Sequence, residues 1–426
     1  MEKILLLQNR HWEKERYPGL IQRDIVTTLI KRLSMKEVQV LLGVRRGGKS
    51  SVFRLLINHL IEDVDPLQIL YINLDDPFFS DVWNDPKLLY AVIETAERLT
   101  DSQPAYLFID EIQNVRGWER FIKSIYDTGQ FKKIFITGSN SSLLKGTYAR
   151  LLSGRYIADY VFPFSFREIL DYNGIVTYKD LLANSPKVLR LLDDMLRYGS
   201  FPEVWKTGDP ALKRDLLVNY YETIILKDCI ANNAIRDVRT FKELAFYMVS
   251  NIGGMYSYNS LARSINSNEN TVKGFINIIE DSFLFTEIKN FSYKLKMQAT
   301  GKKKCYCVDN GLINAVSFMF SENRGRLFEN LVFTEFLKNG YKDIYFFHNK
   351  KECDFIIKKE RQMMAVQVVY EINSQNRKRE LDGLSSAMER FNIPRGYIIT
   401  FNQEEKISKD ITIMPFWKIY KEILKR

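Results

Sequence analysis

The residues best suited to chemistry lie between Gly43 and Ser50, where the chain reads GVRRGGKS. Glycines at this spacing let the backbone wrap around phosphate oxygens, and successive N–H groups at the start of a helix face the anion. In such a loop Lys49 reaches the terminal phosphates and Ser50 ligates magnesium. The alternative is a glycine-rich turn that matches by chance. The predicted nucleotide-binding residues are Gly43, Arg46, Gly47, Gly48, Lys49, Ser50 and Ser51.

A pair of acids follows a second apolar run. Tyr106 to Ile109 has the composition of a buried strand and ends in Asp110 and Glu111. Ligands of open α/β folds bind at the carboxyl ends of the strands, so these acids are expected beside the glycine-rich loop. Asp110 would hold magnesium through water, and Glu111 would orient or deprotonate the attacking water. The alternative for the pair is a solvated acidic turn.

A third apolar run, Lys133 to Thr137, leads into Gly138, Ser139 and Asn140. A polar side chain here could contact a γ-phosphate or the attacking water. Serine and asparagine after a strand are equally ordinary as turn and helix-cap residues. The sequence leaves both interpretations open.

The elements that must position these residues follow from the apolar pattern. From Val38 short apolar runs alternate with helical stretches, which predicts a parallel sheet with helices on both faces. From Glu168 to about Ile288 the apolar spacing is mostly three or four residues, which indicates helices. Strand-like runs return after about Gly325. The predicted fold class is therefore α/β, with a nucleotide-binding core over residues 1–166, a helical region over 167–235, and further domains over 236–320 and 321–426.

Composition limits the class of protein. The chain has 426 residues, 46% hydrophobic and 27% charged, as in ordinary globular proteins. The formal charge of +10 favours polyanionic partners if the excess is clustered. No apolar run approaches the roughly 18 to 20 residues needed to cross a bilayer, and the N-terminal run is too short for a secretory signal. We therefore expect a cytoplasmic protein whose cysteines are reduced core residues.

The segments GVRRGGKS, LFIDEIQNVRGWE, FITGSNSSLL and LLSGRYIADYVFPFSFREIL, in that order, resemble the AAA+ superfamily. More narrowly, the chain is similar to prokaryotic ATPases in which such a module precedes a helical domain of unknown function and a nuclease-like domain. The resemblance implies ATP and Mg²⁺ as ligands. It also implies a sensor at Ser139 or Asn140, of which we take Asn140, and an arginine at the phosphates in cis or from a neighbouring copy. Arg150 and Arg155 are the candidates, and we take Arg155; a plain surface arginine is the alternative for each. Relatives form rings, filaments, dimers or monomers, so a homo-oligomer is an open possibility.

The stretch from Phe241 to Phe291 resembles a winged helix, which many proteins place in the major groove of DNA. It is expected to contain a short strand at Met255 to Tyr258, a helix at Asn259 to Ile265 and a recognition helix at Glu269 to Ile279. Residues Lys289 to Lys304 include six lysines and no acid. This segment is predicted to bind DNA phosphates without selecting a sequence, and the alternatives are a solvated loop or a contact with other protein domains.

The last domain is similar to the PD-(D/E)xK nucleases. Glu329 opens a helix, Asp354 starts a strand, and Gln367 and Val369 stand where an acid and a lysine are expected. A neutral amide binds magnesium weakly and valine stabilises no negative charge, so cleavage is not expected unless Glu371 or Lys378 substitutes spatially. The fold is then retained for packing, for a partner or for holding DNA.

The predicted function is a magnesium-dependent ATPase that acts as a nucleotide-driven switch on DNA or on a protein partner, away from any membrane. One alternative is a DNA-binding or scaffold protein with little ATP turnover. A second is an ATP-gated nuclease, which the two substitutions disfavour.

Overall fold

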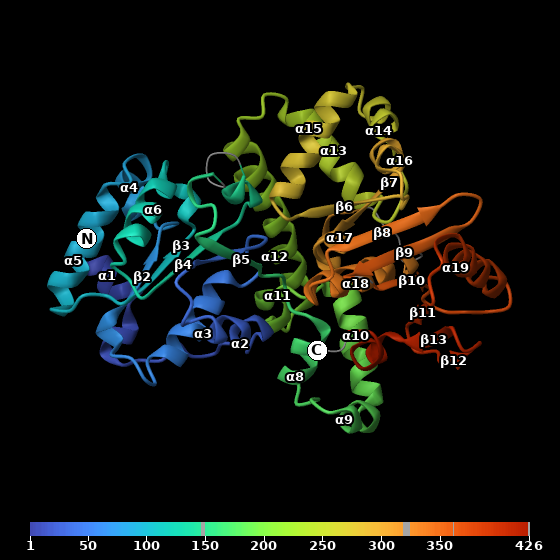
Figure 1. Ribbon diagram of the computed structural model, residues 1–426, viewed down its shortest axis with the longest axis horizontal. Coiled ribbons are helices and arrows are strands. Elements are labelled where there is room, and N and C mark those ends of the chain that lie inside the picture. Colours follow the sequence, from blue (N-terminus) through green and yellow to red (C-terminus); the bar gives the residue numbers. More distant parts are fainter. Residues whose placement is uncertain (146–149, 318–323, 361, 425–426) are drawn as a thin grey trace. The chain divides into compact units, whose positions relative to one another are not determined.

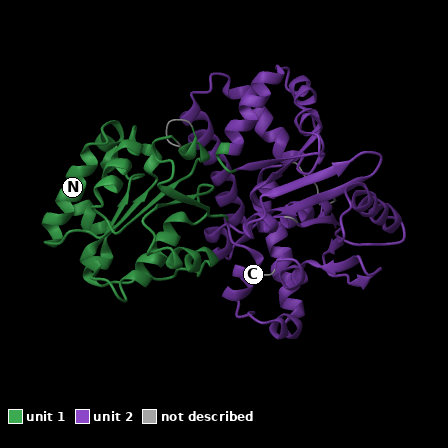
Figure 2. Cartoon of the chain, viewed as in Figure 1, with its two compact units in different colours: residues 1–162, 281–283 green, residues 163–280, 284–426 purple. Residues whose placement is uncertain are grey.

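The computed structural model describes residues 1–145, 150–317, 324–360 and 362–424 (Figure 1). The chain divides into two compact units (Figure 2). Unit 1 comprises residues 1–162 and 281–283, and unit 2 comprises residues 163–280 and 284–426. Three of the predicted domains thus lie largely within unit 2, and their predicted boundary at residues 320 and 321 falls outside the described residues. No helix of the described chain is long and apolar enough to span a bilayer.

Unit 1 is built on a parallel sheet with the order β2-β3-β4-β1-β5. Its strands are β1 (Val38–Leu42), β2 (Ile69–Asn73), β3 (Tyr106–Asp110), β4 (Lys133–Gly138) and β5 (Tyr156–Tyr160). Leu42 pairs with Gly138, and Asn73 pairs with Asp110. Because every strand runs in the same direction, the loops after β1, β3 and β4 leave the sheet at one edge. The predicted parallel sheet is confirmed.

Helices cover both faces of this sheet (Figure 1). They are α1 (Glu2–Gln8), α2 (Asp24–Lys31), α3 (Lys49–Leu60), α4 (Ser80–Asn84), α5 (Leu88–Thr100) and α6 (Trp118–Thr128). Helices α1, α5 and α6 pack on one face through residues such as Leu5 and Ile122, and α2 and α3 pack on the other through Leu29 and Phe53. With apolar layers on both sides, β1 is buried at every position, which explains why four of its five residues, VQVLL, are apolar.

Unit 2 begins with helices, as predicted. They are α8 (Phe166–Tyr172), α9 (Tyr178–Ala183), α10 (Ser185–Tyr198), α11 (Pro202–Lys206) and α12 (Pro210–Thr223), followed by a π-helix at Ile224–Ala231. Ser165 starts α8 with a capping box, since its hydroxyl accepts from the Glu168 N–H and the Glu168 carboxylate accepts from the Ser165 N–H.

The next segment contains α13 (Val238–Ser250), α14 (Tyr258–Ser264), α15 (Glu269–Asp281) and an antiparallel pair of strands, β6 (Phe285–Lys289) and β7 (Lys303–Cys307), with α16 (Leu295–Thr300) between them. The predicted strand at Met255 to Tyr258 is wrong: only Tyr256 forms a bridge, to Lys303, and α14 begins at Tyr258 because Ser257 caps it. The predicted helices at Asn259 to Ile265 and Glu269 to Ile279 correspond to α14 and α15.

The rest of unit 2 is a mixed sheet with flanking helices. The sheet order is β12-β13-β11-β10-β9-β8. The elements are α17 (Asn310–Val316), α18 (Arg324–Lys338), β8 (Asp343–His348), β9 (Glu352–Lys359), β10 (Gln362–Val368), α19 (Arg377–Phe391), β11 (Gly396–Thr400), β12 (Glu405–Lys406), β13 (Ile411–Pro415) and α20 (Ile419–Glu422). All four cysteines of the chain are buried and free of disulfides, as predicted.

Candidate nucleotide-binding site

The loop between β1 and α3 requires glycine for steric reasons. A Cβ on Gly43 would lie 2.1 Å from the Val161 carbonyl oxygen, and one on Gly47 would lie 3.0 Å from the Val44 carbonyl oxygen. Gly48 has φ of 104°, a left-handed conformation that turns the backbone into the first residue of α3. The loop therefore packs tightly and leaves the N-terminus of a twelve-residue helix facing the edge of the sheet.

Lys49 is the first residue of α3, and its side chain folds back over the loop. Its ammonium donates to the carbonyl oxygens of Gly43 at 3.0 Å and Val44 at 3.3 Å, and lies 3.4 Å from Glu111 Oε1. The residue is only 4% exposed. A charged donor held at the mouth of an N-terminal anion site is well placed to bind phosphate.

Asp110 ends β3 beside the loop and is buried. Ser50 and Thr137 donate hydroxyl hydrogen bonds to its carboxylate, and Tyr71 donates to Oδ2 at 3.0 Å. Burial and then the charge of Glu111 raise the pKa of Asp110. A cation at this carboxylate would relieve that cost.

Ser50 and Asp110 supply oxygen ligands of the kind that Mg²⁺ prefers. In the described part of the chain no group of three or more His, Cys, Asp and Glu side chains could hold a metal unaided. A magnesium ion at Ser50 and Asp110 would take its remaining ligands from a nucleotide and water, because Mg²⁺ is usually held by one or two protein groups plus phosphates.

Glu111 follows Asp110 in the left-handed conformation, with φ of 56°, and its N–H donates to Thr137 Oγ1 at 2.9 Å. Gln113 Nε2 donates to Glu111 Oε2 and, at 3.1 Å, to Ser139 Oγ. Burial opposes ionisation of Glu111, but the charges of Lys49 and Arg45 outweigh it and lower the pKa. The carboxylate is therefore ionised and oriented, as a base or water-positioning group must be.

Three further residues of the site escaped the sequence analysis: Tyr71, Gln113 and Thr137. Tyr71 is the middle residue of β2, Thr137 is the next-to-last residue of β4, and Gln113 follows the end of β3 by three residues. The bonds of Tyr71 and Thr137 to Asp110 depend on strand order, which the sequence did not provide, whereas Gln113 reaches Glu111 within the same loop. For Tyr71 and Thr137, strand order is thus the missing information, rather than residue type.

The two candidates for the sensor residue, Ser139 and Asn140, have different hydrogen-bond partners in the structure. Ser139 is buried and its hydroxyl accepts from Gln113, which links it to Glu111. Asn140 Oδ1 accepts from the Ser142 N–H and caps the 3-10 helix Ser141–Leu144. The capping role that the sequence left open for Asn140 is therefore present, and a catalytic role for it stays a prediction.

The structure does not bring Arg155 to the glycine-rich loop of its own chain. Arg155 directly precedes β5, whose first residue Tyr156 pairs with Val38 at the start of β1, so Arg155 lies at the opposite end of the sheet. Its Nε lies 3.0 Å from Asp127 Oδ1. Arg150 is exposed and follows residues 146–149, which are outside the described chain. An arginine supplied by a neighbouring copy stays a prediction.

A second group of predicted residues converges in unit 2. Asp354 on β9 and Gln367 on β10 are neighbours across the sheet: the Asp354 N–H donates to Gln367 Oε1 at 3.2 Å. Lys304 Nζ, from β7, lies 2.9 Å from Glu329 Oε1 and 3.7 Å from Asp354 Oδ1. The predicted Glu, Asp and Gln positions thus meet, and the lysine among them is Lys304 rather than Lys378 or a residue of β10.

Two lysines of the predicted basic segment are consequently not available to DNA. Lys304 is 2% exposed, and Lys303 is 3% exposed because its ammonium donates to the carbonyl oxygens of Ala299 and Gly301. The prediction that these two lysines bind phosphates is wrong, since their charges are used inside the protein. The other four lysines of the segment are exposed: Lys289, Lys294, Lys296 and Lys302.

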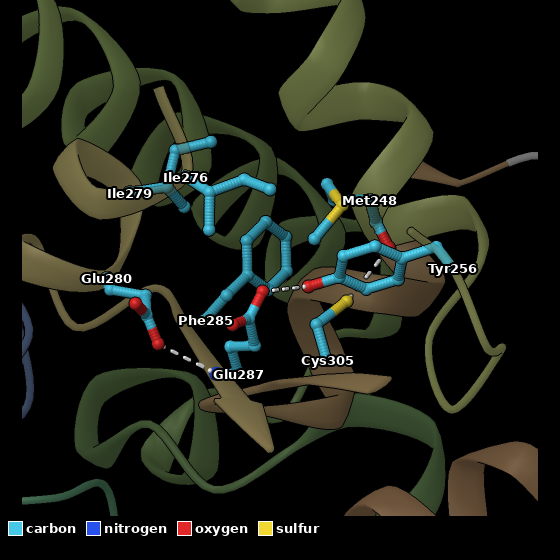
Figure 3. A pocket seen from close by; sticks show the side chains of 8 residues that line it. All are labelled: Met248, Tyr256, Ile276, Ile279, Glu280, Phe285, Glu287 and Cys305. Carbon is cyan, nitrogen blue, oxygen red and sulfur yellow. Dashed lines mark hydrogen bonds between the residues drawn. The ribbon is translucent and has the colours of Figure 1, made fainter. Parts of the chain in front are cut away.

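The space between α13, α15, β6 and β7 is a packed interior rather than a ligand site (Figure 3). It has no room for a water molecule. Glu287 accepts from the hydroxyls of Tyr256 at 2.9 Å and Tyr258 at 2.8 Å, and the Glu287 N–H donates to Glu280. Burial raises the pKa of Glu287. These polar groups satisfy one another.

Comparison with known protein families gives three matches along the chain. Residues 35–170 match the family described as an AAA domain, and residues 189–323 and 324–419 match two domains of unknown function.

Among curated proteins, the uncharacterized protein MJ1544 of Methanocaldococcus jannaschii is 30% identical over 419 residues, which cover 94% of this chain and 90% of that protein. An uncharacterized protein of Haemophilus influenzae is 30% identical over 346 residues, which cover 79% of this chain and 83% of that protein.

Among solved structures, the Aeropyrum pernix ORC1 protein in complex with DNA is similar with a TM-score of 0.33 and 14% identity, over 72% of this chain and 95% of that chain. AMPPCP-bound DnaA from Aquifex aeolicus is similar with a TM-score of 0.28 and 17% identity, over 63% of this chain and 90% of that chain. Likeness of this degree carries no argument about ligands or partners.

Proposed function

This chain belongs to the family of AAA-domain proteins that includes the M. jannaschii and H. influenzae relatives, and from that premise we propose that unit 1 binds ATP with Mg²⁺ and hydrolyses it. One observation carries the proposal. Lys49, Asp110 and Glu111 come from two different strand ends and meet, buried, at the glycine-rich loop. A lysine, a magnesium-type carboxylate and an ionised base in one place are what phosphoryl transfer to water requires.

Each residue has a distinct part in the reaction. The loop N–H groups and the N-terminus of α3 hold the phosphates, and Lys49 exchanges its bonds to the Gly43 and Val44 carbonyls for phosphate oxygens. Ser50 and Asp110 would hold Mg²⁺, which neutralises charge on the phosphates when bound. Glu111, held by Gln113, orients a water molecule and accepts its proton.

The test is steady-state ATP hydrolysis by the wild type, Lys49→Ala and Glu111→Gln, each with Mg²⁺ and with EDTA. Turnover should fall by about two to three orders of magnitude in either variant, the loss typical of removing one preorganised group from a reacting centre. Glu111→Gln should still bind ATP, while Lys49→Ala should bind it weakly. Lys31→Ala, an exposed lysine of unit 1, is the matched control. A wild type that neither binds nor hydrolyses ATP would refute the proposal.

We further propose that the nucleotide state controls a partner of unit 2, either DNA or a protein. The observation that favours a partner is the segment between β6 and β7. Tyr293, Leu295 and Met297 are 71%, 78% and 59% exposed, and exposed lysines lie beside them. Large apolar side chains exposed together are typical of an interaction site. DNA binding through α15 and these lysines is the more specific version, and self-association and a cytoplasmic location stay predictions.

ATP turnover measured with and without DNA distinguishes these versions. Stimulation by duplex DNA that disappears in Lys294→Glu and Lys296→Glu variants supports a DNA partner. If DNA does not change the rate of ATP turnover and the protein binds no DNA at low salt, the partner is a protein instead. Salt-dependent DNA retention with negligible turnover would favour a DNA-binding scaffold.

A further inference from the structure

A large cavity in unit 2 has no part in ATP hydrolysis. It has a volume of ≈1020 Å³ and is lined by residues of α18, β9, β10 and α19, together with Lys304 of β7. It contains the residues that resemble a nuclease site: Glu329, Asp354 and Gln367. A cavity of this size accommodates far more than a water molecule or an ion.

Lys304 supplies a fixed positive charge on the floor of this cavity. Its Nζ lies 2.7 Å from Glu352 Oε1, 2.9 Å from Glu329 Oε1 and 3.7 Å from Asp354 Oδ1. Burial alone would lower the pKa of Lys304, but Glu329, Asp354 and Glu352 outweigh it and raise the pKa. One ammonium therefore stands within ion-pair distance of three carboxylates, which is the position that a divalent cation takes in a metal site.

Gln367 also makes the floor of the cavity a poorer metal site. A neutral amide replaces the expected acid, and both of its ends are engaged: Oε1 accepts from the Asp354 N–H, and Nε2 donates to Glu380 Oε2 at 2.6 Å. The floor thus has an amide where the nuclease pattern has an acid, and its lysine comes from β7 instead of β10.

The rim of the cavity is positively charged. Arg326 on α18, Lys350 in the turn before β9 and Lys378 on α19 are exposed, and none of them has an ion pair within the described chain. Two further cations of the rim are neutralised by neighbours, Lys351 by Asp382 at 2.9 Å and Arg379 by Glu380. Three exposed cations without an ion pair among the described residues surround a floor whose acids face Lys304, and, after the hydrogen bond from Lys351, the charge of one of them, Lys378, also lowers the pKa of Asp382.

We propose that this cavity binds the phosphodiester backbone of a nucleic-acid strand without a divalent cation, with Lys304 standing where a metal ion would stand. The rim cations contact phosphates, and the lysine on the floor lets the backbone approach acids that would otherwise repel it. The strand is held and not cleaved. The inference is independent of ATP hydrolysis, because the cavity shares no residue with the nucleotide site.

The test is binding of a fluorescein-labelled DNA duplex and of a single strand of the same length, followed by anisotropy without nucleotide, in EDTA and in Mg²⁺. The wild type should bind equally in both buffers. A Lys350→Glu and Lys378→Glu double variant should bind more weakly, and the slope of log affinity against log salt should decrease by about two, one for each lost phosphate contact. Lys409→Glu, an exposed lysine between β12 and β13, should bind as the wild type does.

Several results would overturn the proposal. Binding that EDTA abolishes would mean that a metal is required. A rim variant that binds like the wild type, or binding lost only in Lys294→Glu and Lys296→Glu, would place the nucleic acid elsewhere. Mn²⁺ titration followed by electron paramagnetic resonance should give identical curves for the nucleotide-free wild type and Glu352→Gln. A manganese ion lost in that variant would show that Lys304 does not replace a metal.

Discussion

Lys49 and Lys304 are buried lysines that each pair with carboxylates, and their surroundings differ in one respect. Lys49 in unit 1 lies 3.4 Å from one acid, Glu111, and its hydrogen bonds go to backbone carbonyls. Lys304 in unit 2 lies within 2.7 to 3.7 Å of three acids. Carbonyl oxygens bind an ammonium less strongly than carboxylates do. Lys49 can therefore exchange its partners for an incoming phosphate, while Lys304 is retained by its own.

The difference shows what separates a binding lysine from a structural one. Both side chains are nearly inaccessible, so exposure does not distinguish them. The number of carboxylates near the ammonium does distinguish them, because a ligand that takes the lysine must compensate for the loss of its interaction with each carboxylate. The two lysines should accordingly respond in opposite ways to substitution: loss of Lys49 should cost activity, and loss of Lys304 should cost stability.

The largest expected effect is on stability, from Lys304→Met. Removing the ammonium leaves buried Asp354 and the partly buried Glu329 and Glu352 without their shared counter-ion, and breaking a buried ion pair costs about 3–5 kcal/mol. The free energy of unfolding of unit 2 should fall by this amount, measured by urea denaturation followed by circular dichroism. Lys302→Met, two residues away in sequence but exposed, is the control and should change the free energy of unfolding by at most about 0.5 kcal/mol. Equal stability of the two variants would remove the distinction between the lysines.

Acid should change the stability of the two units in opposite directions, because burial lowers the pKa of His11 in unit 1 and raises the pKa of Asp309 in unit 2. Burial lowers the pKa of His11 in unit 1 from 6.5 to about 4, with its ring hydrogen-bonded to the Ile69 carbonyl. Between pH 6.5 and 4 the unfolded chain binds a proton that folded unit 1 does not, so unit 1 should lose roughly 3 kcal/mol as pH falls through that range. Burial raises the pKa of Asp309 in unit 2 to about 6, so its contribution increases over the same fall in pH.

Unfolding followed at several pH values tests this prediction. In His11→Gln the acid-dependent loss in unit 1 should disappear, whatever the stability of the variant at neutral pH. His59→Gln is the control, since His59 is partly exposed and its ring contacts Glu62. If unit 1 keeps its stability down to pH 4.5 in the wild type, the buried neutral imidazole is not what distinguishes it from unit 2 under acid.

Local patterns predicted much of unit 1 and less of unit 2. Each feature that was predicted in unit 1 is a continuous run of residues, so periodicity and spacing were enough to find it. These features are the glycine-rich loop, the apolar strands and the acids Asp110 and Glu111. Lys304 was assigned to an exposed basic segment because its neighbours in sequence are lysines. Its burial depends on Glu329, 25 residues away, and on two acids of β9. No property of the segment itself carries that information.

Arg155 illustrates the same limit. Its distance from the loop depends on which strand β5 pairs with and in which direction. The sequence identified β5 as part of the resemblance but did not specify its partner. Thr137 was missed for the corresponding reason, since it reaches Asp110 from the neighbouring strand β4. Residue types could be predicted from sequence, whereas contacts between strands required the fold.

A smaller effect is expected from Gly43→Ala, which tests whether Lys49 depends on the shape of its loop. A Cβ at this position would lie 2.1 Å from the Val161 carbonyl oxygen, so the backbone must shift, at a cost of about 1–3 kcal/mol. Because Lys49 bonds to the Gly43 carbonyl, that shift should weaken ATP binding, measured by isothermal titration. Gly208→Ala, where a Cβ meets no atom within 4 Å, should leave binding unchanged. Normal binding by Gly43→Ala would mean that the loop yields readily and that its close packing does not position Lys49.

The smallest expected effect comes from Gln113→Ala and concerns the one acid that Lys49 contacts. Gln113 touches Glu111 and Ser139 but neither the loop nor Lys49, so it acts as a positioning residue. Its loss should lower kcat about tenfold through a misoriented base, and leave the KM for ATP unchanged, because the binding contacts remain. Gln103→Ala, exposed and outside the site, controls for the substitution itself. If KM rises together with the fall in kcat, Gln113 supports the nucleotide as well as Glu111. The Lys49 site would then be held by side chains from several elements, as the Lys304 site is. Lys49 and Lys304 would differ less in how easily a ligand replaces their partners than their distances to carboxylates indicate.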